Sequence, residues 1–134
     1  MFRAKDFMKT AVICARPEMP IYDALRLLAN RNITSMPVVD AELNLVGMLG
    51  ENEALKTVYD NREDQSHCVS DFMSRNYTSF DAETNLVELC EHMMTSAAAG
   101  RLAPITRGRK LLGIVGRSDL VRAILRIKHQ ELPD

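Results

Sequence analysis

Apolar residues are spaced at helical intervals in the segment that follows Pro20, and proline suits the first position of a helix. Two short apolar runs come next, at residues 36–39 and 45–49, and each has the length of a strand. A second helix is expected after Gly50. An extended segment at residues 11–14 precedes these elements, so their order is predicted to be β-α-β-β-α. The helical stripe consists of Ile21, Ala24, Leu25 and Leu28.

The same order of elements returns in the second part of the chain. An extended segment at residues 77–80 is followed by a predicted helix, for which Thr84 is a good N-cap. Strand-like runs at residues 103–105 and 111–115 come next, and another helix is expected after Gly116. The two helical stripes consist of Leu86, Leu89, Cys90, Met93 and Met94, and of Leu120, Val121, Ile124, Leu125 and Ile127.

The two parts share residues at matching positions, 65 to 67 residues apart. A period of that length, present only twice, argues against a solenoid, which needs three or more stacked repeats. Half of a 134-residue chain would bury only a marginal core by itself, so the halves are expected to fold together. The sequence predicts an α+β fold in which two β-α-β-β-α repeats, residues 1–62 and 63–134, pack with pseudo-two-fold symmetry. The matching segments are 6–8 with 71–73, 36–38 with 103–105, and 45–50 with 111–116.

Composition narrows the class of protein. With 46% hydrophobic and 26% charged residues, the chain resembles a globular protein, and no apolar run approaches the roughly 18 residues of a membrane span. The net charge of −1 argues against bulk binding to nucleic acid or membranes. Cys14, Cys68 and Cys90 show no CxxC spacing and are interpreted as reduced, partly buried thiols, so a cytoplasmic location is expected.

Positive charge is concentrated near the end of the chain. Eight basic residues lie between Arg101 and Lys128, and Asp119 is the only acid among them. This stretch is either the solvated face of a strand and a helix or part of an anion site, and the sequence leaves both open. The bases are Arg101, Arg107, Arg109, Lys110, Arg117, Arg122, Arg126 and Lys128.

The ordered set of motifs resembles a CBS domain, named after cystathionine β-synthase. The first repeat has Thr-Ser-Met-Pro-Val-Val-Asp at residues 34–40, and the second has Gly-Ile-Val-Gly-Arg-Ser-Asp-Leu at residues 113–120. Because both repeats are present, the chain from Ala4 to Lys128 resembles a tandem CBS pair, or Bateman module.

The resemblance implies a regulatory role without catalysis. Such pairs bind adenosyl compounds (AMP, ADP, ATP or S-adenosylmethionine) between their two repeats, as regulatory ligands rather than cofactors. No attached effector domain is expected. The resemblance therefore implies that the output passes to a separate, unidentified partner protein or through an oligomer.

Asp119 is expected in the first turn of a helix, three residues after Gly116. Unpaired N–H groups and the helix dipole attract phosphate at this end of a helix. The carboxylate of Asp119 can accept hydrogen bonds from ribose hydroxyls, as acids do in dinucleotide folds, or it can cap the helix. In the first repeat Glu53 matches Asp119 and Glu51 matches Arg117. The extra negative charge is expected to weaken the first repeat's site.

The resemblance also indicates which residues line the two ligand sites. The chain departs from the family where Gly50 and Gly116 replace a Thr or Ser whose hydroxyl would reach phosphate. The stronger site is expected to consist of Met8, Ile13, Ile33, Thr34, Ile114, Arg117, Ser118 and Asp119. The weaker site is expected to consist of Met48, Glu53, Met73, Thr78, Arg101 and Leu102.

Two other functions are weighed against a ligand-binding regulatory module: an enzyme and a ligand-free interaction module. Catalysis has little support, because His67, His92 and His129 are scattered and no nucleophile, P-loop or paired-acid motif occurs. No catalytic or metal-binding residue is therefore predicted. A ligand-free interaction module would also explain why Gly50, Gly116 and Glu53 depart from the family's ligand-binding residues. This alternative stays open.

The sequence further predicts the assembly and the class of ligand. The apolar stripes of the second repeat exceed what one small core needs, so a homodimer that pairs through exposed helices is expected. A ligand with phosphate is favoured over S-adenosylmethionine, because hydrogen bonds from Arg to phosphate are strong. The stripe residues in question are Leu89, Met93, Leu120 and Ile124.

Overall fold

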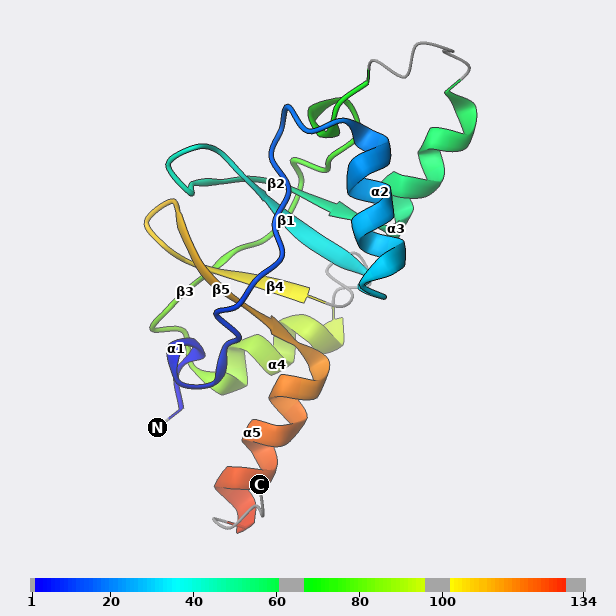
Figure 1. The fold of residues 1–134 in the computed structure, drawn as a ribbon. Helices are drawn as coiled ribbons and strands as arrows, with labels where there is room; N and C mark the ends of the chain where they lie inside the picture. Colours follow the sequence, from blue (N-terminus) through cyan, green and yellow to red (C-terminus); the bar gives the residue numbers. More distant parts are fainter. Residues whose placement is uncertain (1, 61–66, 96–101, 130–134) are drawn as a thin grey trace. The chain divides into compact units, whose positions relative to one another are not determined.

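The structure is a computed structural model that describes residues 2–60, 67–95 and 102–129. It combines helices and strands, as the sequence predicts, in the order drawn in Figure 1. The chain divides into two compact units. Unit 1 consists of Met1–Ala11, Thr78–Gly108 and Leu112–Asp134, and unit 2 consists of Val12–Tyr77 and Arg109–Leu111. Each unit therefore combines most of one sequence repeat with a short segment of the other.

Unit 2 is built on an antiparallel pair of strands, in which Pro37 lies opposite Met48. Three of the four predicted stripe residues of the first helix are buried in its core, and Leu25 is half-buried. The elements are α2 (Ile21–Asn30), β1 (Ser35–Val39), β2 (Leu45–Gly50), α3 (Glu51–Leu55), η1 (Lys56–Tyr59) and η2 (Val69–Asp71). The core consists of Ala15, Ile21, Ala24, Leu28, Met36, Val38, Leu49, Val69 and Met73.

Unit 1 is built on a three-stranded sheet in the order β3-β4-β5, in which β3 runs parallel to β4. The elements are α1 (Ala4–Phe7), β3 (Phe80–Asp81), α4 (Leu86–Thr95), β4 (Leu102–Arg107), β5 (Lys110–Gly116) and α5 (Arg117–His129). Its core consists of Ala4, Phe80, Ala82, Leu86, Leu89, Met93, Ala103, Ile105, Val115, Leu120 and Ala123.

The helix starts differ slightly from those expected. Pro20 is the N-cap of α2 rather than its first residue. Helix α4 begins at Leu86, and its cap is Asn85 rather than Thr84, because the Glu88 N–H donates to Asn85 Oδ1 at 2.9 Å. Both residue types cap helices well, so side-chain geometry decides between them.

The extended lead-ins form less sheet than predicted. Residues 77–80 contribute only the start of β3, and residues 11–14 form no strand. Instead Ala15 makes a single parallel bridge, donating to Pro37 O and accepting from Val39 N–H, both at 2.9 Å. The next rung of that ladder would require an N–H at Pro37, which proline lacks.

Each lead-in begins before its predicted extended segment, at residue 3 or residue 68, and crosses a strand of the other repeat. In unit 1, Lys9 and Ile114 exchange two backbone hydrogen bonds of 2.9 Å. In unit 2, Ser74 and Met48 exchange two of 2.8 and 2.9 Å. The Asp-Phe-Met segments at residues 6–8 and 71–73 therefore each belong to the unit that is formed mainly by the other repeat.

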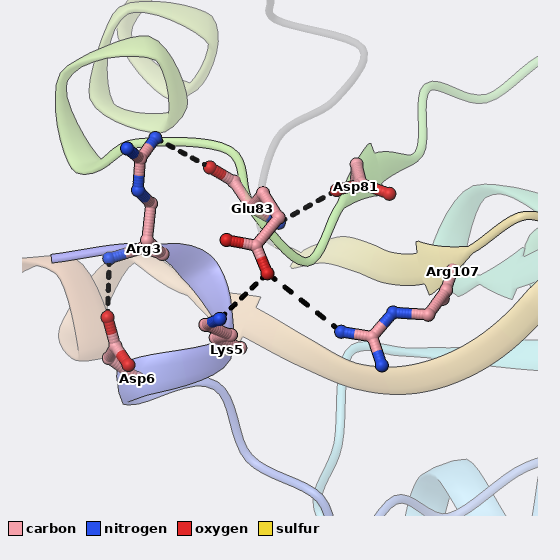
Figure 2. Close-up of polar contacts among 6 residues, drawn as sticks. All are labelled: Arg3, Lys5, Asp6, Asp81, Glu83 and Arg107. Carbon is pink, nitrogen blue, oxygen red and sulfur yellow. Dashed lines mark hydrogen bonds and ion pairs between the residues drawn. The ribbon is translucent and has the colours of Figure 1, made fainter.

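A cluster of polar contacts holds the first lead-in to the turn before α4 (Figure 2). Arg3 donates to the backbone oxygen of Glu83 at 3.0 Å, and Lys5 Nζ lies 2.7 Å from Glu83 Oε2. Arg107 lies 4.0 Å from the same carboxylate oxygen. The Arg3 N–H donates to Asp6 Oδ2 at 2.8 Å at the start of α1. These contacts join residues 3–6 to the turn before α4 and to the end of β4.

Helix α2 ends in a Schellman motif, in which Asn32 adopts a left-handed φ of 54°. The Asn32 N–H donates to Ala29 O at 3.4 Å, and the Ile33 N–H donates to Leu28 O at 3.1 Å. The turn delivers Ile33 and Thr34, two predicted ligand residues, directly to the start of β1.

The predicted apolar face of α5 is partly wrong. Leu120 is buried together with Ala123, whereas Val121, Ile124, Leu125 and Ile127 are 38–56% exposed. Of the four residues offered as the dimer surface, Leu89, Met93 and Leu120 belong to the core of unit 1, and only Ile124 is exposed. No helix in the described part of the chain is long and apolar enough to span a membrane.

Candidate ligand site

The predicted ligand residues fall into both units. Of the stronger site, unit 1 holds Met8, Ile114, Arg117, Ser118 and Asp119, and unit 2 holds Ile13, Ile33 and Thr34. Of the weaker site, unit 2 holds Met48, Glu53 and Met73, and unit 1 holds Thr78 and Leu102. Arg101 lies outside the described residues.

Asp119 is the third residue of α5, and its side chain is only 5% exposed. Its Oδ2 accepts a hydrogen bond from the Gly116 N–H at 2.8 Å. Its Oδ1 accepts one from Arg122 at 2.8 Å, one helical turn further on. The capping role that the sequence allowed is therefore present. A carboxylate offers about four lone-pair positions, so these two contacts do not exhaust its capacity to accept.

Lys9 is a second cation beside this carboxylate. Its Nζ lies 3.6 Å from Asp119 Oδ1, and its side chain is 55% exposed. The three side chains Lys9, Asp119 and Arg122 together carry one net positive charge. Sequence reasoning overlooked Lys9, although it follows Met8 directly and its match in the other repeat is the neutral Ser74.

Met8 and Ile114 are brought together by the backbone bridge at Lys9. Both residues are half-buried. The Met8 side chain lies against Gly113, where an added Cβ would stand 2.8 Å from the Met8 sulfur. Two of the residues predicted to line the stronger site thus occur at one crossing of chain segments in unit 1.

Arg117 and Ser118, the first residues of α5, are both exposed. The Arg117 guanidinium donates to the backbone oxygen of Met93 at 3.0 Å, near the end of α4. A guanidinium has five N–H donors, so it can make several hydrogen bonds at once.

The matching helix start in unit 2 is arranged similarly. Glu53 Oε1 accepts from the Gly50 N–H at 2.8 Å, as Asp119 does from Gly116. The Glu51 N–H donates to Thr34 O at 3.1 Å, which ties Thr34 to the start of α3. Ile13 and Ile33 are half-buried and pack against the core of unit 2.

The three cysteines are free thiols of intermediate burial, as predicted. Burial raises the pKa of the Cys90 thiol, and it raises the pKa of Cys14 against an opposing effect of Arg16. Both thiols are therefore held in the protonated, less reactive form at neutral pH. Among the described residues, no group of three or more His, Cys, Asp or Glu side chains is placed to hold a metal ion.

The chain matches the CBS domain family twice, over residues 4–60 and 69–126. It belongs to the CBS domain family. The CBS domain-containing protein YhcV of Bacillus subtilis is 32% identical, and the match covers 98% of this chain and 99% of YhcV. The paired repeats in sequence and structure thus form a tandem CBS pair.

A solved structure of similar fold is that of CBSX2 in complex with AMP. It has a TM-score of 0.82 and 27% identity, and the match covers 96% of this CBS pair and 100% of CBSX2. Some relatives are much longer. The chain spans 33% of the uncharacterized protein MJ1426 of Methanocaldococcus jannaschii, at 38% identity over 42% of the chain. It spans 14% of the A-adding tRNA nucleotidyltransferase of Aquifex aeolicus, at 25% identity over 91% of the chain.

Proposed function

We propose that this CBS pair is a regulatory module that binds a phosphate-bearing adenosyl ligand and transmits its occupancy to a partner protein. The observation that supports this most is the start of α5, where two cations lie beside Asp119, the residue to which the family resemblance assigns the ribose contact. The similar protein CBSX2 is in complex with AMP. The proposed ligand residues are Met8, Ile13, Ile33, Thr34, Ile114, Arg117, Ser118 and Asp119.

The charge at this helix start favours an anionic ligand. Lys9 and Arg122 together exceed the charge of Asp119, and Arg117 adds another cation in the first turn. The first turn of a helix also offers backbone N–H donors to phosphate. AMP, ADP or ATP is therefore proposed ahead of S-adenosylmethionine, which carries no phosphate.

The second site, formed by Met48, Glu53, Met73, Thr78, Arg101 and Leu102, is proposed to be weaker. Ser74 replaces Lys9 at the matching position, and Glu51 replaces Arg117. A carboxylate in the first turn would repel phosphate where the other site attracts it.

No catalytic activity is proposed for the chain itself. The tRNA nucleotidyltransferase is matched over only a small part of its length, so its activity is not carried over. The regulated partner and the cytoplasmic location stay predictions from the sequence. A homodimer is also proposed, on the exposed apolar residues of α4 and α5 rather than on the buried stripe.

Calorimetry with AMP, ADP and ATP tests the ligand site. Loss of the ribose hydrogen bonds in Asp119→Ala is expected to cost about 2–4 kcal/mol, or about 30- to 1000-fold in affinity. Glu53→Ala is the matched control, since it removes the corresponding cap in unit 2 and should leave the main site intact. Both variants must retain a cooperative unfolding transition, because each loses a capping contact.

The alternative of a ligand-free interaction module makes the opposite prediction. A ligand that binds the native state raises its stability by mass action. If saturating AMP, ADP, ATP and S-adenosylmethionine all leave the thermal midpoint unchanged, the ligand-binding function is wrong. If a folded Asp119→Ala protein binds nucleotide as well as the parent, the assigned site is wrong.

A further inference from the structure

Lys9 stands out because its backbone is fixed while its side chain is not. Both its N–H and its carbonyl oxygen bond to Ile114 at 2.9 Å, within unit 1. The side chain is 55% exposed, and its ammonium reaches Asp119 Oδ1 only at 3.6 Å. The amine is thus anchored at the helix start by a rigid crossing, yet it can swing on a four-carbon stem.

The partners of Asp119 differ in how easily a ligand would displace them. The Gly116 N–H and Arg122 both lie at 2.8 Å, the length of a charge-assisted hydrogen bond. The Lys9 ammonium lies 3.6 Å from Asp119 Oδ1, whereas the Arg122 guanidinium lies 2.8 Å from the same oxygen, so Lys9 is 0.8 Å further away. Because the Lys9 side chain is 55% exposed and its ammonium is 3.6 Å away, it is the most weakly held of the three partners and the one that a ribose would displace.

We propose that Lys9 determines the specificity of the site for phosphate-bearing adenosyl ligands. Without a ligand, its ammonium partly neutralises Asp119. When ribose hydroxyls take its place on the carboxylate, the ammonium turns to the phosphate of the same ligand. This inference rests on the proposed function, and it adds a residue that the family motif does not include.

The mechanism treats two kinds of ligand differently. For AMP, the ion pair lost with Asp119 is replaced by an ion pair with phosphate, so Lys9 contributes to affinity. For 5′-methylthioadenosine, which has the same base and ribose without phosphate, Lys9 only competes for the carboxylate. Removal of the charge should therefore weaken AMP binding and leave methylthioadenosine binding unchanged or slightly tighter.

The test is calorimetry of the parent, Lys9→Gln and Lys9→Arg with AMP and with 5′-methylthioadenosine. Lys9→Gln is expected to weaken AMP binding about tenfold, the effect of one charge-assisted contact. Lys9→Arg should restore most of that loss. The AMP affinity of Lys9→Gln should also fall less steeply with added salt than that of the parent, because one fewer ion pair is screened.

Lys5→Gln is the matched control, since Lys5 belongs to the same lead-in but pairs with Glu83 at 2.7 Å and not with Asp119 (Figure 2). It should leave both affinities unchanged. An AMP affinity of Lys9→Gln equal to that of the parent overturns the inference, as does an equal loss for both ligands, which indicates a positional role. A parent protein that binds neither ligand overturns the proposed function itself.

Discussion

Gly113 and Gly47 occupy matching positions, each where a lead-in crosses a strand. A Cβ at Gly113 would stand 2.5 Å from the backbone oxygen of Lys9. A Cβ at Gly47 would stand 2.6 Å from the Met73 sulfur, the mobile part of a flexible side chain, and 3.2 Å from the backbone oxygen of Ser74. The two glycines are alike in sequence, but the obstacles that they face differ.

Gly113→Ala should therefore destabilise the fold more than Gly47→Ala. Overpacking costs typically about 1–3 kcal/mol, and the backbone obstacle at Gly113 places that substitution at the upper end. Met73 can rotate away from Gly47, which places the second substitution at the lower end. Urea unfolding of both variants measures the difference, and equal losses of stability would contradict the argument that the backbone of Lys9 yields less than the Met73 side chain.

The crossing of Lys9 and Ile114 also explains which ligand-site residues could be predicted from the sequence. Asp119 and Met8 are recognisable because they stand in motifs that recur in both repeats. Lys9 has no such signal, because its match is Ser74 and its importance comes from a bridge to Ile114, 105 residues away. Only the folded backbone places its ammonium beside Asp119.

At the scale of elements, the helix periods and strand runs predict the order correctly, because each stripe must face a core. The loss of strand structure at residues 11–14 was not predicted, since it depends on the missing N–H of Pro37 in the neighbouring strand β1. The core-facing side of α5 was also misjudged. Its apolar residues surround much of the helix, and only packing against the rest of unit 1, including α1 and α4, decides that Leu120 and Ala123 point inward.

The end of α2 offers a test at this scale. Asn32 takes the left-handed conformation that Gly and Asn tolerate, and a Cβ without a polar group is disfavoured there by about 1–2 kcal/mol. Asn32→Ala should therefore lower the unfolding free energy by about 1 kcal/mol, while Asn32→Gly should be close to neutral.

Denaturant unfolding of the two Asn32 variants separates backbone conformation from lost side-chain contacts. A loss of stability in the glycine variant as large as in the alanine variant would point to the Asn side chain instead. Nucleotide affinity is a second measurement, because the turn delivers Ile33 and Thr34 to the start of β1. The alanine variant should lose some affinity as well as stability.

At the scale of the whole molecule, the exposed apolar residues of unit 1 predict self-association. Helices α4 and α5 contact one another and expose large hydrophobic side chains: Val87, Met94, Val121, Ile124, Leu125 and Ile127. Exposed apolar side chains gathered on two helices that touch are typical of a protein interface. Acidic residues of α4 and basic residues of α5 add complementary charge, since Glu88 and Glu91 are exposed on one helix and Arg126 and Lys128 on the other.

Light scattering at tens of micromolar should therefore report twice the 15.1 kDa mass of the chain. Val121→Glu places a charge in the apolar surface of α5 and should shift the mass toward that of a monomer, because an unpaired charge in an interface is costly. Leu43→Glu is the matched control, since Leu43 is 55% exposed and Val121 is 56% exposed, and Leu43 lies outside both helices. A parent that scatters as a monomer would exclude the homodimer, and equal dissociation by both variants would exclude this surface.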